Sequence, residues 1–147
     1  MLDIVYKERA KRWYERALQE KDEFIKFLLL FISFEISAKL NKFNRLKDIK
    51  RDDSIKGKFF DKIDQEFLEE LKSELNERPL QNMKTNGDSE WSGRLGSVDD
   101  FDGVIEFIIR ARNNLFHGDK GLDEERDLFI VKSGAKILQP LVEAIIL

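Results

Sequence analysis

The residues best suited to chemistry lie in the stretch RARNNLFHGDK, from Arg110 to Lys120. It contains His117, the only histidine of the chain, and Arg112 precedes that histidine by five positions. An imidazole exchanges protons near neutral pH, and a guanidinium binds anionic oxygen atoms. These two residue types could together do acid–base chemistry on an anionic group, if the fold brings their side chains to one place.

Arg112 sits where a charge is costly. On a helical wheel it falls within an apolar arc, whereas Arg110, Asn113 and Asn114 fall on the opposite side, which we expect to face solvent. A buried guanidinium needs a partner, so Arg112 must either meet a carboxylate or line a cleft that admits an anion. Glu35 is the only acid in the apolar run FIKFLLLFISFEISAKL. A buried pair of Arg112 with Glu35 is thus the purely structural interpretation of this arginine.

His117 has a structural interpretation as well, because a histidine cation stabilises the C-terminal end of a helix. Gly118 follows it and can adopt the left-handed conformation that ends a helix. In an unbroken helix, Arg112 and His117 would point about 140° apart. The two side chains therefore converge only if the backbone turns at Gly118.

We expect Arg112 and His117 to lie on a helix, because apolar residues recur at helical intervals throughout the chain. The alternation of apolar and polar residues that is typical of a β-strand does not occur. We expect helices over residues 3–20, 22–43, 60–77, 98–117 and 123–146, the fourth capped by Ser97 and Asp100. Residues 44–58 are expected to form a connection, and residues 79–97, rich in Gly, Asn and Ser, a long loop. The predicted fold is all-α, a mostly antiparallel bundle of four or five helices in one domain over residues 1–147.

Composition narrows the class of protein. The chain has no cysteine and one histidine, so we expect neither disulfides nor a metal site. It shows no signal peptide, and its most apolar segment is too short and too charged to span a bilayer, so we expect a cytoplasmic protein without membrane contact. The net charge is −3, yet residues 39–62 hold nine basic against four acidic residues. This segment is either a solvated helix end or a local patch for nucleic acid.

Arg112, Asn113 and His117, in RNNLFHG at the end of an apolar helix, resemble the R-x4-6-H signature of the HEPN superfamily, without indicating a subfamily. The resemblance implies a metal-independent endoribonuclease without a cofactor, often a toxin or another defence component with an antitoxin protein as partner. His117 would be the acid–base group, Arg112 would bind the scissile phosphate, and Asn113 would orient the phosphate or the imidazole. Asn114 would contact the RNA substrate, and Glu35 would hold Arg112 in place. Cleavage would leave a 2',3'-cyclic phosphate and a 5'-hydroxyl.

One histidine cannot conveniently act as general acid and general base in the same turnover. A two-fold homodimer would bring two copies of Arg112 and His117 to one cleft, and the apolar C-terminal run LQPLVEAIIL is compatible with dimerisation. Many HEPN-like domains, however, have no demonstrated cleavage activity. The alternatives are a non-catalytic module that binds nucleotide, RNA or protein, and a purely structural interaction protein.

Overall fold

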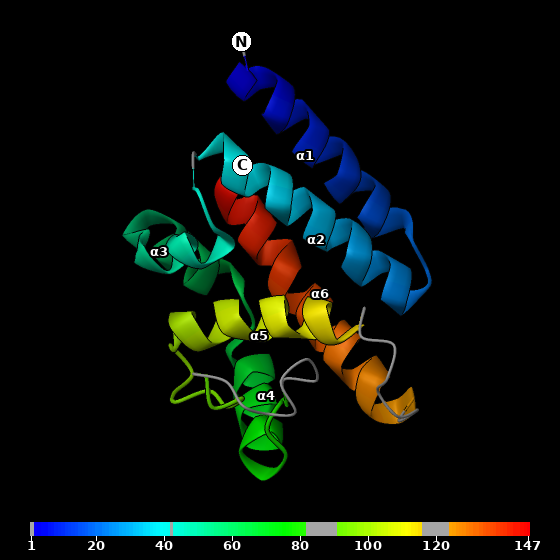
Figure 1. The fold of residues 1–147 in the computed structure, drawn as a ribbon, viewed down its shortest axis with the longest axis vertical. Coiled ribbons are helices and arrows are strands. Elements are labelled where there is room, and N and C mark those ends of the chain that lie inside the picture. The colour runs from blue at the N-terminus through cyan, green and yellow to red at the C-terminus, as the bar shows by residue number, and fades with distance from the viewer. Residues whose placement is uncertain (1, 42, 82–90, 116–123) are drawn as a thin grey trace.

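The described part of the chain folds into helices and their connections. The computed structural model describes residues 2–41, 43–81, 91–115 and 124–147. Its elements are α1 (Leu2–Gln19), α2 (Glu23–Leu40), the 3-10 helix η1 (Leu46–Arg51), α3 (Asp53–Lys62), α4 (Gln65–Glu77), α5 (Phe101–Leu115) and α6 (Glu124–Ile146). Within these ranges there is no strand, so the predicted all-α fold is confirmed (Figure 1). None of the helices in the described ranges has the length and apolarity needed to cross a membrane.

The first two helices, α1 and α2, form an antiparallel hairpin (Figure 1). Asp22 begins α2, because its carboxylate accepts hydrogen bonds from the backbone N–H groups of Phe24 (2.9 Å) and Ile25 (3.1 Å). The two helices approach closely at Ala10, which is fully buried and whose carbonyl accepts a hydrogen bond from Ser33 Oγ at 2.7 Å. Small side chains at this contact therefore hold the hairpin together.

The other large helix contact joins α2 to α6, which runs in the same direction (Figure 1). Phe27 and Phe34 of α2 are completely buried in the core. Gly134 of α6 lies against the first of these rings, and a Cβ added there would lie 2.4 Å from a ring carbon of Phe27. The close approach of α2 and α6 therefore requires a residue without a side chain at this position.

Gly134→Ala is expected to lower the free energy of unfolding by about 1–3 kcal/mol, because the added methyl group must displace a buried phenylalanine ring. Chemical denaturation of the purified variant measures this change. Gly57→Ala is the matched control, since the Cβ added to this helical glycine of α3 meets nothing within 4 Å. The control should be neutral or stabilising by up to about 1 kcal/mol. Equal stabilities of the two variants would contradict the close packing at Gly134.

Residues 44–77 fold differently from our expectation. The predicted connection contains η1 and α3, and the predicted helix over residues 60–77 is divided between α3 and α4. Two aspartates explain why α3 and α4 begin where they do. Asp52 accepts a hydrogen bond from Ile55 N at 2.9 Å, and Asp64 accepts one from Glu66 N at 3.0 Å. Each carboxylate caps the first turn of its helix. The charged composition of the segment concealed these short helices.

The start of α5 also differs in detail. The helix begins at Phe101 rather than at residue 98, and the cap is Asp100, whose carboxylate accepts hydrogen bonds from Gly103 N (2.9 Å) and Gly96 N (2.8 Å). Ser97 instead donates its hydroxyl to Asp99 at 2.6 Å. Asp100 thus ties the preceding loop to the helix that carries Arg112.

Candidate functional site

The last turn of α5 brings Arg112 and Asn113 together. The half-buried Arg112 places its guanidinium carbon 5.7 Å from the centre of the Phe31 ring of α2. Its Nη1 donates to the Asn113 side-chain oxygen at 3.3 Å, in an exposed position. A ring face restrains a guanidinium without neutralising its charge, since the attraction is to the electron-rich face. The ring of Phe31 and the side chain of Asn113 therefore restrain the guanidinium of Arg112 at the end of α5.

Glu35, the predicted partner of Arg112, lies one helical turn after Phe31 on α2 and is half-buried. It takes part in none of the ion pairs found between the described side chains, which join Arg45 to Asp48 and two lysines to Glu106. The structure brings Arg112 to the helix that carries Glu35, but its contact there is with the phenylalanine ring. The predicted buried pair is thus replaced by a cation–π contact.

His117 lies outside the described residues, which break off after Leu115 and resume at Glu124. Its convergence with Arg112 therefore stays a prediction. The described structure establishes the position of Arg112 within the last turn of α5, immediately before the segment that contains the histidine.

The buried arginine of α5 is Arg110, which corrects our expectation that this residue faces solvent. Arg110 is 6% exposed. Its Nη1 donates to the Leu80 carbonyl at 2.8 Å and its Nη2 to the Trp91 carbonyl at 3.1 Å. The guanidinium also lies 4.6 Å from the centre of the Trp91 ring. Burial lowers the pKa of Arg110, and the nearby carboxylate of Glu106 opposes that effect. Arg110 therefore fastens Leu80 and Trp91 to α5.

Asn114 was also expected on the solvent side and is buried instead, at 8% exposure. Its side-chain nitrogen donates to the Gln81 carbonyl at 2.6 Å, so this amide supports the segment after α4. Leu80 N in turn donates to the Gly93 carbonyl at 3.0 Å. Gly93 has a φ of +82°, a conformation that favours glycine. Leu80, Gln81 and Trp91 thus lie against a second face of α5. The side-chain nitrogen of Asn114 is already hydrogen-bonded within the protein.

Two lysines of the basic segment over residues 39–62 form ion pairs with α5. Lys50 Nζ lies 2.6 Å and Lys47 Nζ 3.5 Å from the Glu106 carboxylate. Burial alone would raise the pKa of Glu106, but the two lysines outweigh it and the pKa is lowered. These lysines dock η1 against α5. Arg51, Lys56 and other basic residues of the segment remain exposed.

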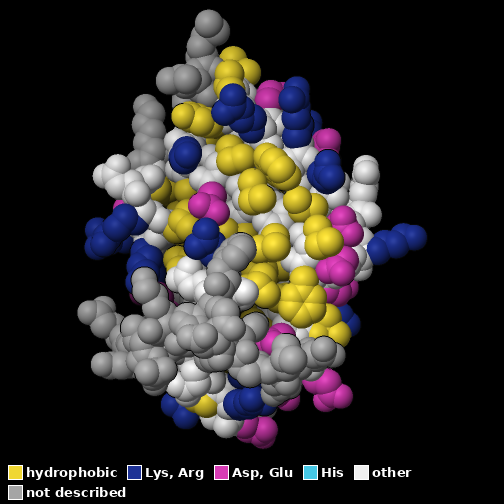
Figure 2. All heavy atoms as spheres, turned by 45° about the vertical axis from the view of Figure 1, so that its right-hand side comes forward, with side chains coloured by type: hydrophobic (Ala, Val, Ile, Leu, Met, Phe, Trp, Pro, Cys, Tyr) yellow, Lys and Arg dark blue, Asp and Glu magenta, His cyan; other side chains and the backbone are white. Residues whose placement is uncertain are grey.

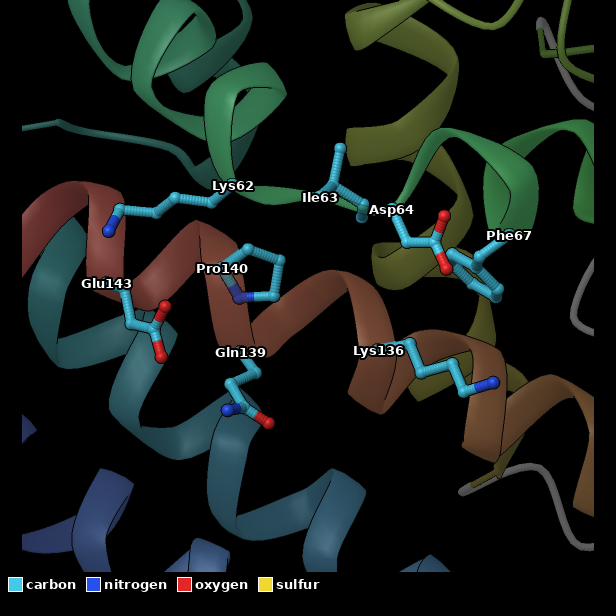
Figure 3. A pocket seen from close by; sticks show the side chains of 8 residues that line it. All are labelled: Lys62, Ile63, Asp64, Phe67, Lys136, Gln139, Pro140 and Glu143. Atoms are coloured by element: carbon cyan, nitrogen blue, oxygen red, sulfur yellow. The ribbon is translucent and has the colours of Figure 1, made fainter.

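A separate hollow lies between the junction of α3 with α4 and helix α6. Its volume is about 290 Å³, and it is lined by Lys62, Ile63, Asp64, Phe67, Lys136, Gln139, Pro140 and Glu143 (Figure 3). Lys136 lies 5.2 Å from the centre of the Phe67 ring. Beside it, Tyr14 donates its hydroxyl to Glu143, and burial together with this carboxylate raises the pKa of Tyr14. None of the predicted site residues lines this hollow.

The described residues contain no group of three histidine or acidic side chains placed to hold a metal ion. Arg110 was missed as an anchor because the loop that covers it has no periodicity. Its only sequence signal is the spacing of Arg110 and Asn114, two polar residues on one face of α5. The chain matches no protein-family model, no curated protein and no solved structure.

Proposed function

We propose that this protein is an endoribonuclease of the HEPN type, in which Arg112 and His117 act on the RNA backbone. The observation that carries the proposal is the position of Arg112. Its guanidinium lies at the surface over Phe31, beside Asn113, in the last turn before the only histidine. This arrangement presents a restrained cation to an incoming phosphate.

RNA supplies its own nucleophile, so the protein needs only acid–base groups and charge. The 2'-hydroxyl loses its proton and attacks the adjacent phosphorus, and the bond to the 5'-oxygen breaks as that oxygen gains a proton. His117 has the side chain suited to move these protons near neutral pH. Arg112 stabilises the negative charge that builds on the phosphate oxygens. The products are a 2',3'-cyclic phosphate and a 5'-hydroxyl, without net oxidation or a co-reactant.

Each chain supplies one histidine, whereas the reaction requires both removal and delivery of a proton. A homodimer with two such residues at one cleft would separate these two tasks. A nuclease of this kind is harmful to its host unless controlled, so the proposal includes a role as a toxin held by an antitoxin protein.

The proposal is tested by incubating the purified protein with single-stranded RNA in EDTA and analysing the ends of the fragments. The expected result is cleavage that leaves 2',3'-cyclic phosphates. RNA that shifts in a gel but stays intact would contradict the nuclease and would instead assign a binding module.

Exposed lysines of α3 are expected to make RNA binding dependent on salt, because each phosphate contact releases counterions. Measured by fluorescence anisotropy, the slope of log affinity against log salt should become less steep by about 0.7 for each contacted lysine that is removed. Lys56→Ala and Lys58→Ala test this, since both side chains are exposed. The control is Lys7→Ala with Lys11→Ala, two exposed lysines of α1. If the parent and the α3 variant have the same slope of log affinity against log salt, α3 does not contact the RNA.

A further inference from the structure

Two features of the surface differ in what they indicate about a ligand. Figure 2 shows hydrophobic side chains gathered on one face of the molecule, with charged side chains around them. An apolar face alone defines no particular ligand, because hydrophobic burial is not directional. The hollow between the junction of α3 with α4 and helix α6, which we call the α6 hollow, also holds charged side chains in defined places (Figure 3). Its chemistry therefore narrows the choice of ligand.

The size and lining of the α6 hollow suit a small molecule. Its volume of about 290 Å³ is close to the lower end of the range for small-molecule sites. Its apolar lining consists of Ile63 and Pro140, which are buried, and Phe67, which is half-buried. In Figure 3 the ring of Pro140 lies between the two ends of the hollow, and Phe67 lies at one of them. A ligand of this site thus has an apolar part that covers Pro140 and reaches toward Phe67.

The charged groups at the Phe67 end of the hollow already have structural roles. Asp64 accepts a hydrogen bond from Glu66 N at 3.0 Å and so caps α4. The ammonium of Lys136 lies 5.2 Å from the centre of the Phe67 ring, in a cation–π contact between α6 and α4. The other end of the hollow is therefore the better place for the charged part of a ligand.

That other end holds one carboxylate and one ammonium, those of Glu143 and Lys62 (Figure 3). Glu143 is half-buried and accepts a hydrogen bond from the Tyr14 hydroxyl of α1, which restrains its carboxylate. A carboxylate has about four acceptor positions, so Glu143 can accept from a further donor. Lys62 is exposed, and the ion pairs between the described side chains include neither Lys62 nor Glu143. The two charges thus line the same end of the hollow without being paired to each other.

The opposite signs of these two charges decide which ligand they favour. A simple anion would be attracted by Lys62 and repelled by Glu143, and a simple cation would meet the reverse. A ligand that carries both an ammonium and a carboxylate can pair with both side chains. In an α-amino acid these two groups are attached to the same carbon atom. Both can therefore reach one end of the hollow while the side chain extends toward the other.

We propose that the α6 hollow binds a free α-amino acid with an apolar side chain. The ammonium of the ligand donates to the Glu143 carboxylate, and its carboxylate accepts from the Lys62 ammonium. The side chain of the ligand lies along Pro140 toward Phe67. The lining of the hollow includes no residue of the proposed nuclease site, so a failure of one proposal leaves the other untouched.

The ligand is tested with L-phenylalanine and L-leucine as probes, by an NMR titration that follows the amide signals of the full chain. L-phenylalanine amide, which lacks the carboxylate, should bind roughly 3-fold more weakly than L-phenylalanine, as expected for loss of an exposed ion pair. N-acetyl-L-phenylalanine, which lacks the ammonium, should bind about 10-fold more weakly, because the half-buried Glu143 loses its donor. Absence of binding by both amino acids at millimolar concentration would overturn the proposal. An analogue that binds like L-phenylalanine would also overturn it, and would assign a site for one end of a peptide.

Two variants test the place of binding. Glu143→Gln removes the charge but keeps an oxygen that can accept the Tyr14 hydroxyl, and it should weaken the binding of L-phenylalanine about 10-fold. Lys62→Met should weaken this binding roughly 3-fold, yet leave the binding of L-phenylalanine amide unchanged, because the amide has no carboxylate to lose. The control is Lys58→Met, an exposed lysine of α3 that does not line the hollow. Lys62→Met still gives a result if Glu143→Gln fails to fold. If Lys62→Met binds L-phenylalanine like the control, the amino acid binds elsewhere and the proposal is wrong.

Discussion

His117→Ala is expected to lower the rate of RNA cleavage by about 100-fold or more, because the acid–base group would be lost from both copies. The measurement is the initial rate of fragment formation at equal protein concentration, with circular dichroism to establish that the variant is folded. A folded His117→Ala protein that cleaves RNA at the parental rate would remove the histidine from the mechanism, and with it the main reason to consider this protein a nuclease.

Arg112→Ala should cause a comparable loss of cleavage with a small cost in stability. The side chain is half-buried, and its contact with Phe31 contributes on the order of 1 kcal/mol. Arg112→Lys keeps the charge but loses the fork that binds two phosphate oxygens, so it should recover only part of the activity. Arg9→Ala, an exposed arginine of α1, is the matched control and should cleave like the parent. Equal activity of Arg112→Ala and Arg9→Ala would contradict the assigned role.

Arg110→Ala, two positions earlier, is expected to destabilise the fold by about 3 kcal/mol. The change removes two hydrogen bonds from a charged donor to the Leu80 and Trp91 carbonyls, and the guanidinium contact with the Trp91 ring. In a domain of this size the midpoint of thermal unfolding should fall by about 10 °C. Differential scanning calorimetry measures it directly.

The control for Arg110 is Arg94→Ala, in the same loop region. Arg94 is exposed, and its hydrogen bond to the Asn76 carbonyl is long, at 3.5 Å. Its loss should therefore cost less than about 1 kcal/mol. Suppose instead that the free energies of unfolding of Arg110→Ala and Arg94→Ala differ by less than about 0.5 kcal/mol, which is within the usual effect of a surface substitution. That result would show that other contacts hold the loop. Arg110→Ala should mainly lower the stability of the fold, whereas Arg112→Ala should mainly lower the rate of RNA cleavage. The comparison therefore distinguishes the arginine that anchors the loop from the one proposed to bind phosphate.

The helical periodicity of the chain was sufficient to predict the all-α fold and the approximate positions of α1, α2, α5 and α6. It also predicted that Arg112 lies near the end of α5, and the residue is in the last turn of that helix. These features follow from local patterns, since apolar residues at helical spacing bury one face wherever the helix packs. The short helices of residues 44–62 have few apolar residues among many charged ones, and capping aspartates start α3 and α4.

Which arginine of α5 is buried was decided by tertiary structure. A helical wheel orders side chains around one helix, but it does not show how many of its faces are covered. Residues 79–81 and 91–95 have no periodicity, yet they pack on the face that looked solvent-exposed and bury Arg110 and Asn114. Arg112 is half-buried, with its guanidinium over the Phe31 ring of α2. Contacts between segments distant in sequence set these burials. The sequence by itself therefore determined the long helices α1, α2, α5 and α6, whereas the tertiary packing decided which polar residues of α5 are buried.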